Sequence, residues 1–439
     1  MIDRASQYDS GSLSLAGTVA MGTGVMIGAG IFALTGQIAE LAGGLFPLAF
    51  LLAAGVSAFS AYAYVKGSSA YPSAGGIAMI LKRAYGPSTT TGAAALLMAF
   101  SMIINESLVA RTFAAYVLRL APDAEPSGWW TPAIAVGLIG LAFAVNVAGN
   151  RFIEAISDVA AVLKIGGLLA FAAIAVAASG VDLRIQPWPP SGDPTVGGFA
   201  GSVALGILAF KGFTTITNSG DEVVEPEKNV GRAIAISLVV CLVVYLGVSY
   251  GLAASLSIDE LVEARDYSLA EAARPALGGY GTLMTVLIAL IATASGLLAS
   301  IFAVSRMLAM LTEMELIPHR HLGMPGDVQK HTLVYTVVLA ALLAALFDLT
   351  RIASMGAILY LVMDITIQWG VLRHLRDDVG ANATVVSIAI VLDAAALAGF
   401  VLVKGTQDPL IVVVSALGIA AVTGFERFYL RSRRSEVAA

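Results

Sequence analysis

The sequence has very little of what builds a metal centre or a disulfide. Cysteine occurs once, as Cys241, and histidine occurs four times in 439 residues. A single thiol excludes an intramolecular disulfide and a thiolate metal cluster, and the histidines form no ligand set. Catalytic patterns such as histidines paired with carboxylates, or a serine–lysine dyad, are not evident either. We therefore expect no metal, no cofactor and no enzymatic activity.

Charged residues are scarce as well. They make up 13% of the chain against 58% hydrophobic residues, whereas a soluble domain carries roughly 25% charged residues. The apolar residues come in runs of about 20, which is the length that crosses roughly 30 Å of hydrocarbon at 1.5 Å per residue. The sequence therefore predicts an all-α integral membrane protein whose solvent is the lipid bilayer, and no nucleic-acid partner.

Polar residues divide the chain into about twelve apolar segments, each a predicted transmembrane helix. No small-residue cleavage pattern follows the first run, so we expect it to stay as a membrane helix. The segments lie near 13–36, 43–65, 88–117, 131–148, 152–179, 196–219, 231–257, 280–312, 331–348, 350–372, 382–403 and 408–427.

Lysine and arginine are unevenly shared between the two sides of this arrangement. With the N-terminus inside, the inner loops and tails hold 16 of them and the outer loops hold six. Positive residues concentrate on the cytoplasmic side of membrane proteins. We therefore expect a multi-pass protein of a prokaryotic plasma (inner) membrane, with both termini cytoplasmic.

Glycines interrupt segments 1 and 6 near their middles. Segment 1 contains Gly28-Ala29-Gly30, and segment 6 contains Lys211-Gly212. Matching interruptions in two halves of a chain indicate an inverted-repeat transporter with a binding site at the membrane midplane. Unwound backbone cannot face lipid, so it must line a protected cavity. An alternative for segment 1 is that Gly24 and Gly28 only allow close helix packing.

An interrupted helix presents both signs of charge. Half-helix N-termini attract an anionic group, and exposed carbonyls attract an ammonium or another cation. A zwitterion such as an amino acid offers both groups. The interruptions therefore favour a transporter of a small molecule, most simply an amino acid.

Several motifs, in order, resemble the amino acid-polyamine-organocation permease superfamily, in particular its prokaryotic proton-coupled amino acid transporters. They are Gly28-Ala29-Gly30-Ile31-Phe32, Tyr71-Pro72-Ser73-Ala74-Gly75-Gly76, Phe210-Lys211-Gly212-Phe213, Asp221-Glu222-Val223, Glu225-Pro226-Glu227-Lys228-Asn229, Arg232-Ala233-Ile234 and Ser305-Arg306 with Pro318. The resemblance implies a leucine-transporter-type 5+5 inverted repeat with broken helices 1 and 6. The first repeat would span 13–179, the second 196–374, and two additional C-terminal helices 382–427.

The resemblance also implies a substrate site and a moving part. Segments 1, 2, 6 and 7 would rock against segments 3, 4, 5, 8, 9 and 10. Phe210 or Phe213 would close the site. The backbone amides around Ala29 and Gly30 would receive the α-carboxylate, and the carbonyls around Met26, Ile27, Leu208 and Lys211 would receive the α-amine. Gly28 and Gly212 would complete the substrate site.

Lys164 lies about halfway along segment 5, where its ammonium reaches neither membrane surface. A charge at that depth costs at least about 2.5–3.5 kcal/mol, and burial favours the neutral amine, so its proton can be exchanged. In the resembling proton-coupled permeases a lysine at this place takes the position of a sodium ion, with the carbonyl of Gly24 and the hydroxyl of Ser295 as partners. We predict that Lys164 carries the coupling proton. The alternative is a permanently charged strut.

Lys211 departs from the pattern, because the resembling proteins usually have an uncharged residue there. It would bind an anionic group of the substrate, pair with Glu106, or point along the cytoplasmic path. Glu106 and its neighbour Asn105 lie well inside segment 3, where an unpaired carboxylate is costly.

Two further polar groups of residues carry weaker predictions. Asp364 and Gln368 share a face of segment 10, where they would line the outer pathway. The acidic loop Asp221, Glu222, Glu225 and Glu227 is interpreted as a solvated face, although the resemblance also allows gating pairs with Lys82 or Arg83.

The leading prediction is a secondary active transporter that imports an amino acid with protons by alternating access. An exchanger of amino acids or a polyamine carrier is the alternative within transport, and Lys211 argues against a polyamine. A channel or a non-transporting sensor is the alternative of another class.

Overall fold

The computed structural model describes residues 11–73, 75–120, 128–148, 150–178, 195–317 and 328–438. The regular elements in these ranges are helices, with one isolated bridge between Leu13 and Val223. The elements are α1 (Leu15–Ala42), η1 (Gly43–Leu45), α2 (Phe46–Ala70), α3 (Gly76–Tyr85), α4 (Thr89–Leu118), α5 (Trp130–Ala148), α6 (Asn150–Ala178), α7 (Val196–Phe210), α8 (Phe213–Asn218), η2 (Gly220–Glu222), α9 (Pro226–Ser255), α10 (Ile258–Glu263), α11 (Ser268–Ala272), α12 (Arg274–Glu313), α13 (Val328–Leu346), α14 (Leu349–Gly370), η3 (Val371–Leu375), α15 (Ala383–Gln407) and α16 (Pro409–Ala438).

Ten helical stretches within the described ranges are long and apolar enough to cross a membrane. The first, Leu15–Ala70, contains both α1 and α2 with η1 between them, and Lys330–Leu346 of α13 adds a shorter apolar helix. These stretches fall on the predicted segments. The all-α, multi-pass membrane architecture is therefore confirmed.

Local sequence explains where several of these helices begin. Ser14, Ser88 and Thr195 each accept a hydrogen bond from a backbone N–H of the first turn of α1, α4 and α7. Such a cap satisfies one of the four N–H groups that a helix start leaves free. Pro226 begins α9, where its missing N–H costs nothing.

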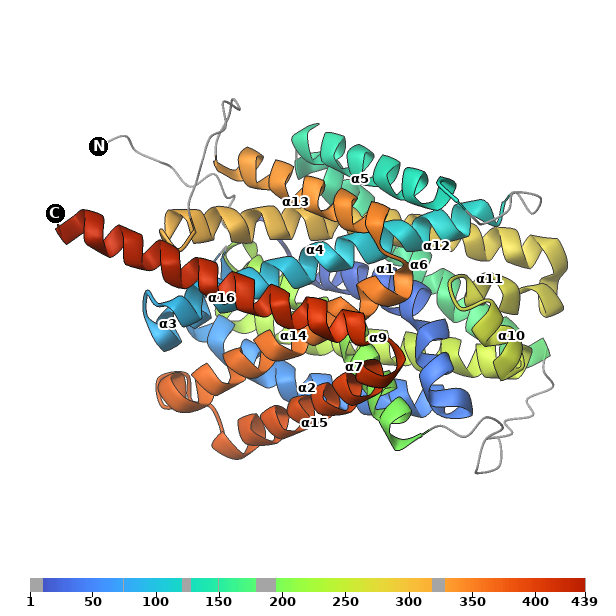
Figure 1. The fold of residues 1–439 in the computed structure, drawn as a ribbon. Coiled ribbons are helices and arrows are strands. Elements are labelled where there is room, and N and C mark those ends of the chain that lie inside the picture. Colours follow the sequence, from blue (N-terminus) through green and yellow to red (C-terminus); the bar gives the residue numbers. More distant parts are fainter. Residues whose placement is uncertain are drawn as a thin grey trace.

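The long helices run along one common direction (Figure 1). The short helix α3 and the C-terminal end of α16 lie at one end of the bundle, and α10 and α11 lie at the other (Figure 1). The helix α4 is almost completely buried and packs against α12, α13, α14 and α5. The helix α4 therefore lies at the centre of the bundle, in contact with these four helices.

The outer helices expose large apolar side chains. Leu141 of α5, Val162 of α6, Val239 of α9, Leu402 of α15 and Leu417 of α16 are all more than half exposed. A soluble protein cannot leave so much apolar surface in water. In a bilayer these side chains face acyl chains.

The prediction that segment 1 is interrupted is wrong for this conformation. The helix α1 continues without a break from Leu15 to Ala42. A Cβ atom on Gly28 would stand 2.8 Å from the carbonyl oxygen of Ala292. The glycine therefore serves close packing of α1 on α12, which was the alternative reading of these residues.

The predicted interruption of segment 6 is present. The helix α7 ends at Phe210, α8 begins at Phe213, and Lys211-Gly212 form the turn between them. The sequence pattern did not predict α3, α10 or α11, because helices of ten residues or fewer are too short to form apolar membrane runs.

Candidate functional site

The turn between α7 and α8 replaces the helical hydrogen-bond ladder with tighter bonds. The amide of Lys211 donates to Leu208 O at 3.3 Å, and the amide of Thr214 donates to Lys211 O at 2.9 Å. These are i to i+3 bonds, the 3₁₀ pattern that often marks a hinge. Gly212 is required here, because a Cβ atom would stand 2.6 Å from Met26 Cγ.

Tyr245 of α9 joins α1 to α7. Its hydroxyl lies 2.6 Å from Met26 O and 3.1 Å from Ala209 O. A Cβ atom on Gly30 would stand 2.1 Å from the tyrosine oxygen. A glycine at position 30 is therefore what lets the hydroxyl reach the carbonyl of α1.

The structure brings the predicted substrate residues of the two helices together, but most of their backbone groups are already paired. The carbonyl of Met26 is held by Tyr245, and those of Leu208 and Lys211 accept backbone amides. The amides of residues 28–30 fall inside an unbroken helix, where the i to i−4 ladder occupies them. In this conformation these backbone groups are therefore paired within the protein and are not available to a substrate.

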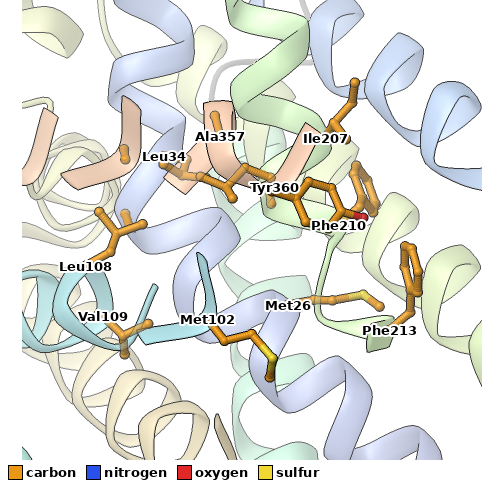
Figure 2. Close-up of a cluster of buried hydrophobic side chains, with 14 of the residues drawn as sticks. Met26, Leu34, Met102, Leu108, Val109, Ile207, Phe210, Phe213, Ala357 and Tyr360 are labelled. Atoms are coloured by element: carbon orange, nitrogen blue, oxygen red, sulfur yellow. The ribbon is translucent and has the colours of Figure 1, made fainter. Parts of the chain in front are cut away.

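Aromatic rings surround the turn. Phe210 packs on Tyr245 with ring centroids 4.9 Å apart, and Phe213 meets Tyr64 of α2 edge to face at 5.2 Å. Figure 2 shows Met26, Phe210 and Phe213 gathered about this turn, within one buried cluster that also includes Tyr360. Both phenylalanines are fully buried, and their gating role stays a prediction.

Lys164 is buried against α1 as predicted. Its side chain is 1% exposed, and a Cβ atom on Gly24 would stand 3.0 Å from Lys164 Nζ. The helix α12 closes the same place, because a Cβ atom on Gly296 would stand 3.0 Å from Gly24 O. The neighbouring Ser295 hydroxyl donates to Ala292 O of its own helix at 3.2 Å, and the hydrogen bonds of the described residues include none between Lys164 and Ser295.

Among the described side chains, the surroundings of Lys164 contain a thiol and no counter-charge. Cys241 of α9 is the titratable group close enough to act on its ammonium, and within the described ranges no carboxylate pairs with Lys164. A buried charge without a partner is costly. This setting favours a lysine that gives up its proton over a permanent strut.

Lys211 points to α4 but does not pair with Glu106. Its Nζ donates to Ser101 O at 2.8 Å and to Ser101 Oγ at 3.1 Å, and it lies 5.7 Å from the ring centre of Tyr360. Glu106 instead accepts a hydrogen bond from Ser300 of α12 at 3.3 Å. No ion pair joins Lys211 and Glu106 among the described residues, but the two groups lie close enough for each to act electrostatically on the other.

The remaining polar residues of this region are buried, and Asp364 and Gln368 hydrogen-bond to side chains of other helices. Asn105, beside Glu106, is 3% exposed. Asp364 accepts a hydrogen bond from the Tyr64 hydroxyl at 2.6 Å, and Gln368 donates to Asp393 of α15 at 2.5 Å. No role is predicted for Asp393 from the sequence. A carboxyl group in the middle of an apolar run is nevertheless a signal of function.

The acidic loop after α8 is not wholly a solvated face. Glu225 and Glu227 are exposed, but Glu222 is buried and forms an ion pair with Arg306 of α12. The loop is also tied to the start of α1, since the amide of Leu13 donates to Glu222 O at 2.8 Å. The pairing escaped prediction because 84 residues separate its partners in sequence.

The opposite end of α1 is covered by the loop between α10 and α11. Arg265 of this loop forms an ion pair with Glu40 at 2.9 Å, and both side chains are more than a third exposed, so the pair adds little stability. Burial raises the pKa of the neighbouring Asp266, and Arg265 acts in the opposite direction. In this conformation, loops therefore contact α1 at both of its ends.

A bundle of membrane helices, with an interrupted helix packed on α1 and a lysine buried beside them, is the arrangement expected of a membrane transporter. The amino acid permease family profile matches residues 13–422. The chain belongs to that family, and it is a multi-pass membrane transporter.

Three relatives illustrate the range of similarity. An uncharacterized protein of Methanocaldococcus jannaschii is 32% identical over 87% of this chain and 86% of its own. The inner membrane transport protein YbaT of Escherichia coli is 28% identical over 89% of each chain. The branched-chain amino acid permease BcaP of Bacillus subtilis is 26% identical over 52% of this chain and 51% of its own.

Proposed function

We propose that this protein imports an amino acid across the inner membrane of a prokaryote together with protons, by alternating access. Membership of the amino acid permease family supports the substrate class, as does the relative whose name gives branched-chain amino acids. The observation that carries the proton coupling is Lys164, which is buried against Gly24 without a counter-charge.

The coupling follows from simple electrostatics. A protonated Lys164 places a positive charge beside Gly24, and it would attract the backbone carbonyl oxygens of that part of α1. Loss of the proton removes this attraction and leaves a neutral amine, which burial favours. Protonation of Lys164 therefore biases the position of α1, and α1 forms one wall of the substrate site.

The substrate would lie between α1 and the turn of Lys211-Gly212. Its ammonium would replace the Tyr245 hydroxyl on the carbonyls of Met26 and Ala209, and its carboxylate would need the amides of residues 28–30. Those amides become free only if α1 opens at its glycines, as in the discontinuous helices that form the binding sites of many transporters.

The larger arrangement belongs to the same proposal. The chain would cross the membrane twelve times, with both termini cytoplasmic. It would contain two five-helix repeats, over 13–179 and 196–374, and an additional pair of helices over 382–427. This arrangement would give a moving bundle and a fixed scaffold. The excess of lysine and arginine in the loops assigned to the inside supports this orientation.

The test has two steps. A panel of amino acids and amines is first screened for those that raise the melting temperature of the purified protein, because a ligand of the folded state stabilises it. The labelled ligand is then offered to proteoliposomes with an inward pH gradient. Accumulation that a protonophore abolishes is expected.

Other outcomes identify the alternatives. Uptake that requires substrate inside the vesicles indicates an exchanger. Stabilisation without any uptake indicates a sensor, and conductance without accumulation indicates a channel.

A further inference from the structure

A second buried polar cluster lies between α2, α14 and α15, on helices other than those that surround Lys164. Its members come from all three helices and are fully buried: Ser60 and Tyr64 of α2, Asp364 and Gln368 of α14, and Asp393 of α15. Two carboxyl groups thus lie deep within membrane helices.

Donors of neighbouring side chains satisfy part of this cluster. The Tyr64 hydroxyl donates to Asp364 Oδ1 at 2.6 Å, and the Ser60 hydroxyl donates to Asp393 Oδ2 at 2.6 Å. The Gln368 amide donates to Asp393 Oδ2 at 2.5 Å and to Ser60 Oγ at 2.9 Å. The hydroxyl hydrogens of Ser60 and Tyr64 are then used.

Three acceptor oxygens remain without a donor. They are Asp364 Oδ2, Asp393 Oδ1 and Gln368 Oε1, each buried. The Gln368 side chain is directed into the cluster by its own amide bonds, so its oxygen is held there without a partner. The two carboxyl groups lie close enough to share a hydrogen bond.

The described groups that face the pair supply no positive charge. The titratable neighbours are Tyr64 of α2 and Tyr360 of α14, while α7 and α8, which pack on α15 and α2, contain no titratable residue. Lys211 lies 5.7 Å from the Tyr360 ring centre, but its ammonium is bound to Ser101.

Two adjacent carboxylates without a cation cannot both stay ionised in this setting, because like charges and burial each favour the protonated form. We propose that Asp364 and Asp393 share one proton and form a second proton-binding site of this transporter. The proton is covalently bound to an oxygen of one carboxyl group and hydrogen-bonded to the other, which supplies the missing donor. A metal cation would instead hold the two groups apart around itself, which the close approach of the carboxyls disfavours.

The site has a direct mechanical link to the interrupted helix. Tyr64 binds Asp364 through its hydroxyl and packs on Phe213, the first residue of α8, through its ring. Loss of the shared proton would leave two negative charges side by side and would drive α14 and α15 apart. The movement caused by ionisation of the pair would therefore be transmitted to the turn of Lys211-Gly212 through Tyr64.

Infrared spectroscopy of the purified full-length protein in nanodiscs tests the shared proton and does not depend on any transport substrate. The wild type is compared at neutral pH with the Asp364→Asn/Asp393→Asn double variant, in potassium buffer, in H₂O and D₂O. The expected difference spectrum contains one protonated carboxyl band, which shifts in D₂O, and the bands of one carboxylate. Asp259→Asn/Asp377→Asn is the matched control, because it removes two exposed carboxyl groups outside the cluster and should keep the protonated band.

The other outcomes overturn the proposal. Carboxylate bands alone mean that both groups are ionised, and a melting temperature that rises with sodium but not potassium would then assign a metal-cation site. Two protonated bands mean two independent neutral acids. If the double variant does not fold, ¹³C-aspartate labelling of the wild type replaces it: the protonated band must shift, and a spectrum without such a band contradicts the shared proton.

Discussion

At the scale of single residues, the Tyr245 hydroxyl is what closes α1 on α7. Its one hydrogen is shared between the carbonyl oxygens of Met26 and Ala209, which lie 2.6 Å and 3.1 Å from the hydroxyl, and the hydroxyl fits only because position 30 has no side chain. The sequence identified Gly30 but not Tyr245, since an aromatic residue in an apolar run is usually plain packing. The closing partner could be found only once α9 was placed beside α1.

Replacement of Tyr245 with Phe should weaken this closure. The ring and its packing on Phe210 remain, and the hydrogen bond of the hydroxyl is lost, at a cost of about 0.5–1.5 kcal/mol. We expect a lower melting temperature for Tyr245→Phe in detergent. Tyr250→Phe is the control, because Tyr250 lies on the same helix and is 44% exposed. Equal melting temperatures for the two variants would show that the hydroxyl does not hold the helices together.

At the scale of elements, Lys211 fastens the turn between α7 and α8 to the central helix α4. Its hydrogen bonds go to Ser101, which in turn donates to Gly356 O of α14 at 3.2 Å. Of the three roles predicted for Lys211, this contact supports a structural one, although with Ser101 as the partner in place of Glu106. The sequence could not supply the partner, because the turn's direction depends on how α7 packs.

Lys211→Met keeps the apolar stem and removes the ammonium. We expect a loss of about 1.5–3 kcal/mol of stability, which is the range for hydrogen bonds of a charged group, while a bound ligand still raises the melting temperature. Ser101→Ala should cost less, because the backbone carbonyl of residue 101 remains as an acceptor. A Lys211→Met protein of normal stability that no longer responds to ligand would instead place the ammonium on the substrate.

The elements also show where sequence patterns are informative. Runs of about 20 apolar residues located the membrane helices because lipid imposes that length. The glycines of segment 1 were ambiguous, since a glycine permits both an interruption and close packing, and here α1 stays whole. The turn at Lys211-Gly212 is present as predicted, although its counterpart in segment 1 is not interrupted. Partners distant in sequence, such as Arg306 for Glu222, leave no local pattern.

At the scale of the whole molecule, the orientation in the membrane can be tested with the chain's single cysteine removed. Asp259 lies at the end of the bundle that holds α10, and Asp377 follows η3; both are exposed. In a Cys241→Ala background, a membrane-impermeant maleimide should label Asp259→Cys in intact cells and Asp377→Cys only after lysis. The reverse pattern would invert the proposed topology.

The central claim is that Lys164 carries the coupling proton, and uptake by Lys164→Ala tests it most directly. In proteoliposomes with an inward pH gradient, the variant should take up the ligand found by thermal shift no faster than protein-free vesicles, while the ligand still raises its melting temperature. Lys404→Ala is the matched control, because Lys404 is also a buried lysine, but on α15, and it should accumulate ligand like the wild type. Unchanged pH-driven accumulation by Lys164→Ala would contradict the account.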